Sequence, residues 1–79
     1  MRLDKYLKVS RLIKRRSVAQ DACTAMRVTV NGTVRKPSYD VKAGDILEIA
    51  FGENAVKVKV LSTEENVKKD NAKDMYEFL

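Results

Sequence analysis

Seven of the first sixteen residues carry a cationic side chain, whereas this segment holds a single acid, Asp4. The seven, called the basic surface below, are Arg2, Lys5, Lys8, Arg11, Lys14, Arg15 and Arg16. The run 17–20, Ser-Val-Ala-Gln, has the pattern of a capping box and predicts that a helix starts there. A helix N-terminus attracts anions through its N–H groups and its dipole, and Arg can grip a phosphate with two parallel N–H bonds. We therefore expect the basic surface to bind phosphate groups.

The charge of the chain is divided unevenly along its 79 residues. Residues 1–39 hold ten Lys or Arg and two Asp, a charge of +8, whereas residues 40–79 carry −3, so that the net charge is +5. Such an asymmetry indicates a polyanionic partner. Nucleic acid is the first candidate and an anionic membrane surface is the second.

The two candidates differ in the apolar side chains that they require. A helix that lies on a membrane needs large apolar groups free to insert, but Leu3, Leu7 and Ile13 are needed for the core of so short a chain. We therefore expect no membrane partner. The chain has no long recognition helix and no dimerisation heptad of the kinds that read DNA, which mildly favours structured RNA over duplex DNA.

Few residues could support catalysis or hold a metal ion. The chain has no His and one Cys, Cys23, which excludes an internal disulfide and a structural zinc site. No acid–base constellation is visible. We therefore expect no catalytic residue, no metal and no cofactor, hence a binding protein of the cytoplasm rather than an enzyme, with Cys23 as a small core residue.

Hydrophobic periodicity predicts the elements that hold the basic surface. A period of 3.6 predicts a helix over 2–13 and a second, of about ten residues, from Ser17. The period then changes to two, with strands at 28–30, 33–34, 46–51 and 56–60 and a hairpin turn at Asn31-Gly32. The predicted fold class is α+β, two N-terminal helices packed on a small, mostly antiparallel sheet. Residues 1–61 should form the RNA-binding domain, and residues 62–79 a charged C-terminal tail that is either a short helix or disordered.

Five motifs follow one another in order between residues 2 and 45. They are Arg2-Leu3-Asp4-Lys5-Tyr6-Leu7, Lys14-Arg15-Arg16-Ser17-Val18-Ala19, Val28-Thr29-Val30-Asn31-Gly32, Lys36-Pro37-Ser38 and Val41-Lys42-Ala43-Gly44-Asp45. Together they resemble the alpha-L RNA-binding motif, the domain first named for the fourth protein of the small ribosomal subunit. Within that superfamily the length of the chain, residues 2–19 and the C-terminal segment 74–79 are most similar to the RqcP family.

This resemblance implies a function in ribosome-associated quality control. RqcP-like proteins sit on the large ribosomal subunit, contact its rRNA and stabilise P-site peptidyl-tRNA during rescue of stalled nascent chains. They support template-free tailing of the chain together with the tailing factor RqcH. Arg2 and Arg16 match the RNA-contacting arginines of the family, whereas Lys5, Lys8, Arg11, Lys14 and Arg15 are expected from their charge. We expect a monomer.

Three other functions remain open. The chain also resembles, less closely, the fifteen-kilodalton heat-shock protein, which binds free large subunits carrying a nascent chain. The apolar end of the tail could recruit a protein partner, and the basic surface could bind DNA. In addition, Met26 stands where the family usually has Gly after the second helix, so we expect that helix to end slightly differently.

Overall fold

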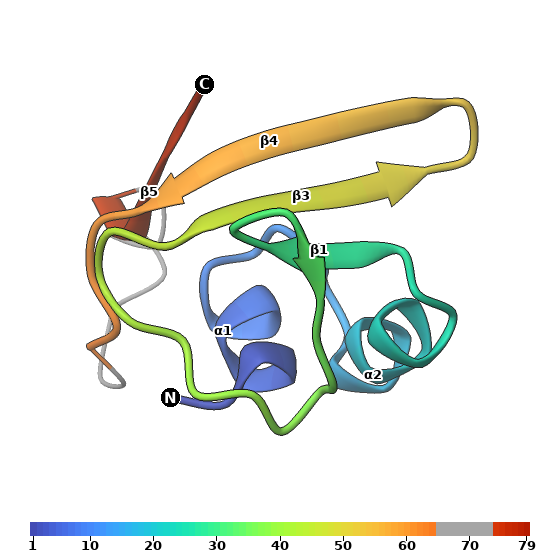
Figure 1. Ribbon diagram of the computed structural model, residues 1–79. Helices are drawn as coiled ribbons and strands as arrows, with labels where there is room; N and C mark the ends of the chain where they lie inside the picture. The colour runs from blue at the N-terminus through green and yellow to red at the C-terminus, as the bar shows by residue number, and fades with distance from the viewer. Residues whose placement is uncertain (65–73) are drawn as a thin grey trace.

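The computed structural model of the chain describes residues 1–64 and 74–79. In these ranges two helices precede five strands (Figure 1). They are α1 (Leu3–Val9), α2 (Arg16–Thr24), β1 (Val28–Val30), β2 (Thr33–Val34), β3 (Ile46–Phe51), β4 (Asn54–Val60) and β5 (Tyr76–Phe78). The strands form one sheet in the order β2-β1-β3-β4-β5, and every pair is antiparallel. The predicted α+β class with two helices on an antiparallel sheet is confirmed.

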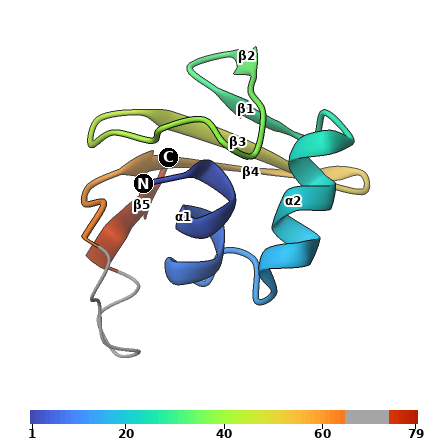
Figure 2. The same cartoon turned by 90° about the horizontal axis from the view of Figure 1, so that it is seen from below.

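Both helices lie against the same face of the sheet (Figures 1 and 2). Side chains alternate between the faces of a strand, so every second residue of each central strand points to the helices, among them Leu47, Ile49 and Val58. The core formed there is apolar: Leu3, Tyr6, Leu7, Ile13, Ala19, Cys23, Val28, Val30, Val41, Leu47, Ile49, Val58, Val60 and Met75 are buried. Lys57 and Lys59 of β4 point to the opposite face and are exposed. Leu3, Leu7 and Ile13 are thus in the core, as the sequence predicts.

Helix α1 is shorter than its periodicity predicts. It ends at Val9, with Ser10 as its C-cap, because Arg11 adopts the left-handed conformation with φ 65°. The Arg11 N–H donates to the carbonyl of Lys8 and the Ile13 N–H donates to that of Leu7. Ile13 is therefore carried back to the core from outside the helix.

Helix α2 differs from expectation at its start. It begins at Arg16 with Arg15 as the N-cap, and no side chain caps it. The predicted capping box at Ser17 and Gln20 is therefore wrong, and the Gln20 amide is bonded elsewhere, to Asp4.

The end of α2 also differs from expectation. Met26 keeps the left-handed conformation with φ 61°, although a shifted helix end was expected. The N–H groups of Met26 and Arg27 donate to the carbonyls of Cys23 and Ala22, the two bonds of a Schellman motif.

The turn between β1 and β2 is the hairpin that the sequence predicts. Asn31 and Gly32 have φ values of 52° and 84°, and Val30 pairs with Thr33, as a type I′ turn requires. The Asn31 side chain also joins two loops, because its Nδ2 donates to Asp45 and its Oδ1 accepts from the N–H of Ile46. Asn31 therefore has a structural role.

The C-terminal end belongs to the sheet. Residues 76–78 form β5 and pair with β4, and Met75 is buried. The Tyr6 hydroxyl donates to the Met75 carbonyl at 2.8 Å, so the end of the chain is bonded to α1. The expectation of a helical or disordered tail is wrong for residues 76–78, which form a strand, and the Met75 side chain next to them completes the core. Residues 65–73 lie outside the described residues.

Candidate nucleic-acid interface

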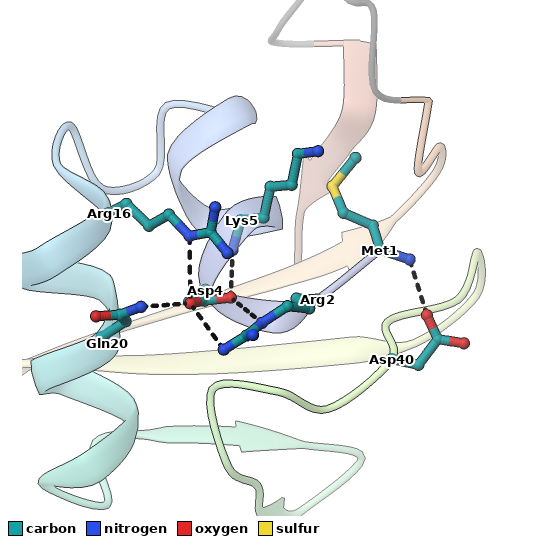
Figure 3. Close-up of polar contacts among 7 residues, drawn as sticks. All are labelled: Met1, Arg2, Asp4, Lys5, Arg16, Gln20 and Asp40. Atoms are coloured by element: carbon teal, nitrogen blue, oxygen red, sulfur yellow. Dashed lines mark hydrogen bonds and ion pairs between the residues drawn. The ribbon is translucent and has the colours of Figure 1, made fainter.

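A buried carboxylate, that of Asp4, lies among three residues of the basic surface, Arg2, Lys5 and Arg16 (Figure 3). Its Oδ1 accepts from the Lys5 N–H at 2.8 Å and from Arg2 Nε at 3.2 Å. Its Oδ2 accepts from Gln20 Nε2 at 2.9 Å, from Arg16 Nε at 3.3 Å and from Arg2 Nη2 at 3.4 Å. Residues of α1, of the segment preceding it and of the first two turns of α2 therefore converge on one group.

These bonds keep Asp4 ionised. Burial alone would raise the pKa of Asp4, but the hydrogen bonds from Gln20, the Lys5 N–H and Arg16, with the charge of Arg16, hold it below its ordinary value. A carboxylate that is fully buried is stable as an anion only when it is paired and hydrogen-bonded. The two arginines supply that pairing.

The ion pairs leave much of both arginines accessible. The side chain of Arg2 is 51% exposed and that of Arg16 is 44% exposed. A guanidinium has five N–H donors, and the bond to Asp4 uses only the Nε–H of Arg16. Two cations share one anion, so the cluster keeps a charge of +1. Arg2 and Arg16 are thus brought together, half exposed and with their orientation restrained.

The other five predicted cations lie around this cluster along the chain. Lys8 is exposed and stands one helical turn after Asp4, on the same side of α1. Lys5, which directly follows Asp4, is half buried. Arg11, Lys14 and Arg15 are exposed in the connection from α1 to α2. The described contacts do not join these three to Asp4.

The N-terminus of α2 strengthens the positive potential near Arg16. Its first turn contains no acidic residue and no side-chain cap, so its N–H groups are not satisfied by a side chain. The first N–H groups of a helix have no acceptor within the helix. Arg15 and Arg16 therefore flank donors that favour an anion.

Sequence reasoning missed the residues that orient the arginines. The sequence indicated Asp4 only as a single acid among the cations, and Gln20 only as a capping residue. The helical pattern gives no signal of its burial, because Asp4 stands one turn before Lys8 on the cationic side of the predicted helix, where a solvated carboxylate is expected. Nothing local to Gln20 reveals its role, which depends on the packing of α2 against α1.

Among the described residues, no other group has the features of a catalytic or metal-binding site. Burial, with a smaller contribution from the Asp4 charge, raises the pKa of the Cys23 thiol to about 11, so the thiol is protonated at neutral pH. Within residues 1–64 and 74–79, no three His, Cys, Asp or Glu side chains gather as a metal site requires. In the same ranges, neither helix has the length and apolar character needed to cross a bilayer.

A separate ion pair fixes the start of α1. The α-amino group of Met1 donates to Asp40 Oδ1 at 2.8 Å (Figure 3). The hydrogen bond from this amino group, with its charge, lowers the pKa of Asp40. The backbone also joins the two segments, since the N–H groups of Leu3 and Asp4 donate to the carbonyls of Tyr39 and Pro37. Segment 37–41 therefore helps to hold Arg2 in place.

Comparison with known proteins gives consistent matches. The model of the family described as S4 domain matches residues 1–47. An RQC P-site tRNA stabilizing factor of Listeria innocua is 54% identical over 79 residues, which are all of this chain and 86% of the relative. The factor of the same name from Bacillus subtilis is 48% identical over 79 residues, all of this chain and 92% of the relative. A structure of heat shock protein 15 of Vibrio cholerae, described as trimeric, has a TM-score of 0.90 at 26% identity and covers all of this chain and 81% of its own.

Proposed function

The chain belongs to the family of RQC P-site tRNA stabilizing factors and contains an S4 domain, and from this premise we propose that it is a non-catalytic, RNA-binding factor of ribosome-associated quality control. It binds the large ribosomal subunit through rRNA and stabilises P-site peptidyl-tRNA while a stalled nascent chain is tailed without a template. An RqcH-like tailing factor is its protein partner, and it acts in the cytoplasm as a monomer.

The observation that supports this function most directly is the pairing of Arg2 and Arg16 across Asp4. Their guanidinium groups remain about half exposed while one buried carboxylate orients both. Arginines held in this way can each donate to a phosphate oxygen without first losing much side-chain entropy. The two would therefore form the fixed centre of the RNA contact.

The neighbouring cations extend this centre. Lys8 on α1 and Arg11, Lys14 and Arg15 in the connection are exposed, and we assign them phosphate contacts around the two arginines. Lys5 belongs to the same surface but is half buried, where this surface meets the core. Phosphate contacts of this kind give affinity and register rather than base specificity.

The test measures binding of the full chain to purified large subunits that carry P-site tRNA. Affinity is determined by co-sedimentation at several KCl concentrations for Arg2→Gln, Arg16→Gln and the double variant. The slope of log K against log[salt] is negative, and each phosphate contact that is lost should reduce its magnitude by about 0.7–0.9. The magnitude of the slope should therefore fall by about 1.4–1.8 in the double variant, which should also lose most of its affinity.

A matched control removes the same charge from the opposite face of the sheet. Lys57→Gln/Lys59→Gln changes two exposed cations of β4 and should leave the slope within error. If the Arg2 and Arg16 variants bind like the unmodified protein at every salt concentration, or if the β4 variant loses as much slope, the assignment of the surface is wrong.

Similarity to heat shock protein 15 of Vibrio cholerae, with its TM-score of 0.90, supports a second candidate, a heat-shock-type binder of large subunits that carry a nascent chain. The two functions differ in their dependence on tailing. The quality-control factor should increase template-free extension of the nascent chain by the tailing factor, and Arg2→Gln/Arg16→Gln should abolish that increase. Binding without any effect on extension would favour the second candidate.

A further inference from the structure

A groove of about 580 Å³ lies beside the basic surface. It runs between the end of α2 and segment 34–38, and Arg2 is one of its lining residues. Its volume is within the range of about 300–1,000 Å³ that is usual for small-molecule sites. Because Arg2 belongs both to the Asp4 cluster and to the groove, RNA bound at the first would pass over the second.

The lining of the groove divides into two chemical parts. Arg2, Arg35 and Lys36 bring three cations to it, and no acidic residue is among the described residues that line it. The apolar part consists of Cys23, Met26, Val34 and Pro37. A nucleotide has the same division, because its phosphate is anionic and its base has two apolar faces.

Two features hold the cationic part in position. The Arg35 guanidinium carbon lies 5.2 Å from the centroid of the Tyr39 ring, a cation–π contact. Both residues belong to the connection from β2 to β3, whose backbone is bonded to the start of α1 through Tyr39 and Pro37. Arg35 and Lys36 are nevertheless exposed. They are therefore restrained near Arg2 and accessible to an anion.

The apolar part contains a strained residue. Met26 has φ 61° and a side chain that is 73% exposed, directly after α2. A left-handed conformation is costly for any residue with a Cβ, and such strain occurs preferentially at functional sites. The conformation places a flexible, polarisable thioether at the groove, a side chain suited to varied apolar surfaces.

We propose that this groove accepts one unpaired nucleotide of the bound RNA, with its phosphate at the three cations and its base against the apolar lining. The inference rests on the proposed function, which supplies RNA as the ligand, and it adds a site that the basic surface does not include. Thr24 and Ser38, which also line the groove, offer hydroxyls to the ribose or to the base edge. An unpaired nucleotide fits because a base in a duplex cannot leave its stack without a cost.

The test uses the full chain, free in solution and labelled with ¹⁵N. Adenosine 5′-monophosphate and ribose 5-phosphate are titrated separately, and amide shifts are followed by NMR. The nucleotide should shift Thr24, Lys36 and Ser38 in a saturable manner. It should bind about fivefold or more tightly than the sugar phosphate, because the base contributes contacts of its own.

Variants identify the part of the groove that acts. Arg35→Gln/Lys36→Gln should weaken binding of both probes, whereas Met26→Gly should weaken binding of the nucleotide only. Lys57→Gln/Lys59→Gln is the control with equal loss of charge. Equal affinities for the two probes, shifts confined to residues near Arg16, or unaltered binding in the Arg35 and Lys36 variant would each overturn the proposal.

The free-protein titration does not depend on the ribosome, so the two proposals can fail separately. If the nucleotide binds in the groove but the Arg16 variant binds subunits unaltered, the groove proposal stands and the proposed function is rejected. Loss of subunit binding in the Arg16 variant, without nucleotide binding in the groove, would do the reverse.

Discussion

At the scale of single residues, Asp4 determines how the basic surface is presented. One buried carboxylate accepts five hydrogen bonds, three of them from two arginines that belong to different segments. The arrangement lowers the local charge by one but restrains the directions of both guanidinium groups. Asp4 is therefore a positioning residue, and its loss should have opposite consequences for charge and for geometry.

Replacement of Asp4 by Asn should destabilise the fold by about 2–3 kcal/mol at pH 7, because hydrogen bonds to a charged acceptor are lost and the new amide faces donors. The pKa of Asp4 is lowered in the folded state, so its contribution is complete above the unfolded value of about 3.9 and is lost as the pH falls through the folded value. Urea unfolding from pH 7 down to about pH 2.5 measures the difference between the two proteins. A difference that stays constant below pH 4 would contradict this role.

The same variant separates charge from geometry in RNA binding. Asp4→Asn raises the net charge by one, so electrostatics alone predicts tighter binding to large subunits. If the carboxylate orients Arg2 and Arg16, binding should instead weaken while the slope against log[salt] does not decrease, because both cations remain. Tighter binding by a folded Asp4→Asn protein would show that orientation of the arginines is unimportant.

The site could be predicted from the sequence only in part. The seven cations were recognised because clustered charge of one sign is visible without coordinates, and the structure exposes six of them. Their RNA contacts stay a prediction. The partners of Arg2 and Arg16 were not foreseen, because Asp4 and Gln20 meet only when α1 packs on α2. Arg35 and Lys36 were also missed, since folding rather than sequence distance brings them beside Arg2.

At the scale of elements, the end of α2 retains a conformation that its sequence does not favour. Met26→Gly should raise the free energy of unfolding by about 0.5–1 kcal/mol, since relief of the left-handed strain exceeds the added entropy of the unfolded chain. The melting temperature should rise by about 2–8 °C. Met26→Asn should have a smaller effect in the same direction, because Asn tolerates this region better than Met. A fall in stability of the Gly variant would mean that the exposed Met26 side chain makes contacts that outweigh the strain.

The strands were easier to predict than the helix ends and the last strand. Alternation at 28–30, 46–51 and 56–60 identifies each strand within the sequence itself, and Asn31-Gly32 specifies its own turn. By contrast, α1 ends early because Arg11 turns left-handed, and the uncapped start of α2 depends on Gln20 bonding to Asp4. Strand β5 depends on long-range contacts, including the bond from Tyr6 to the Met75 carbonyl. Local patterns contain no information about such contacts.

This packing changes how the C-terminal end can be tested for partner recruitment. Deleting residues 62–79 would remove the buried Met75 and the acceptor of the Tyr6 hydroxyl along with any docking surface. Loss of function in such a truncated chain would not separate recruitment from unfolding. Substitution of Phe78 and Leu79, which are exposed, changes the surface and leaves the buried contacts in place.

At the scale of the whole molecule, the division of charge opposes folding and favours binding. Residues 1–39 carry +8, and the seven cations of the basic surface lie on or directly before α1, in the connection to α2 and at the start of α2. Like charges held in a compact state repel one another and destabilise it. Phosphates of a bound RNA would neutralise this repulsion, so that salt should act on the free protein and on its complex in opposite directions.

Raising KCl from about 50 to 300 mM should therefore increase the melting temperature of the free protein by a few degrees, because exposed charges are screened while the buried Asp4 pairs are screened much less. The same change should weaken large-subunit binding strongly. Lys14→Gln/Arg15→Gln, which removes two exposed cations from the connection, should reduce both salt effects, and circular dichroism and co-sedimentation measure them on the same samples. A melting temperature that falls with salt would show that the attractive pairs, Asp4 with its arginines and Asp40 with the α-amino group, outweigh the repulsion.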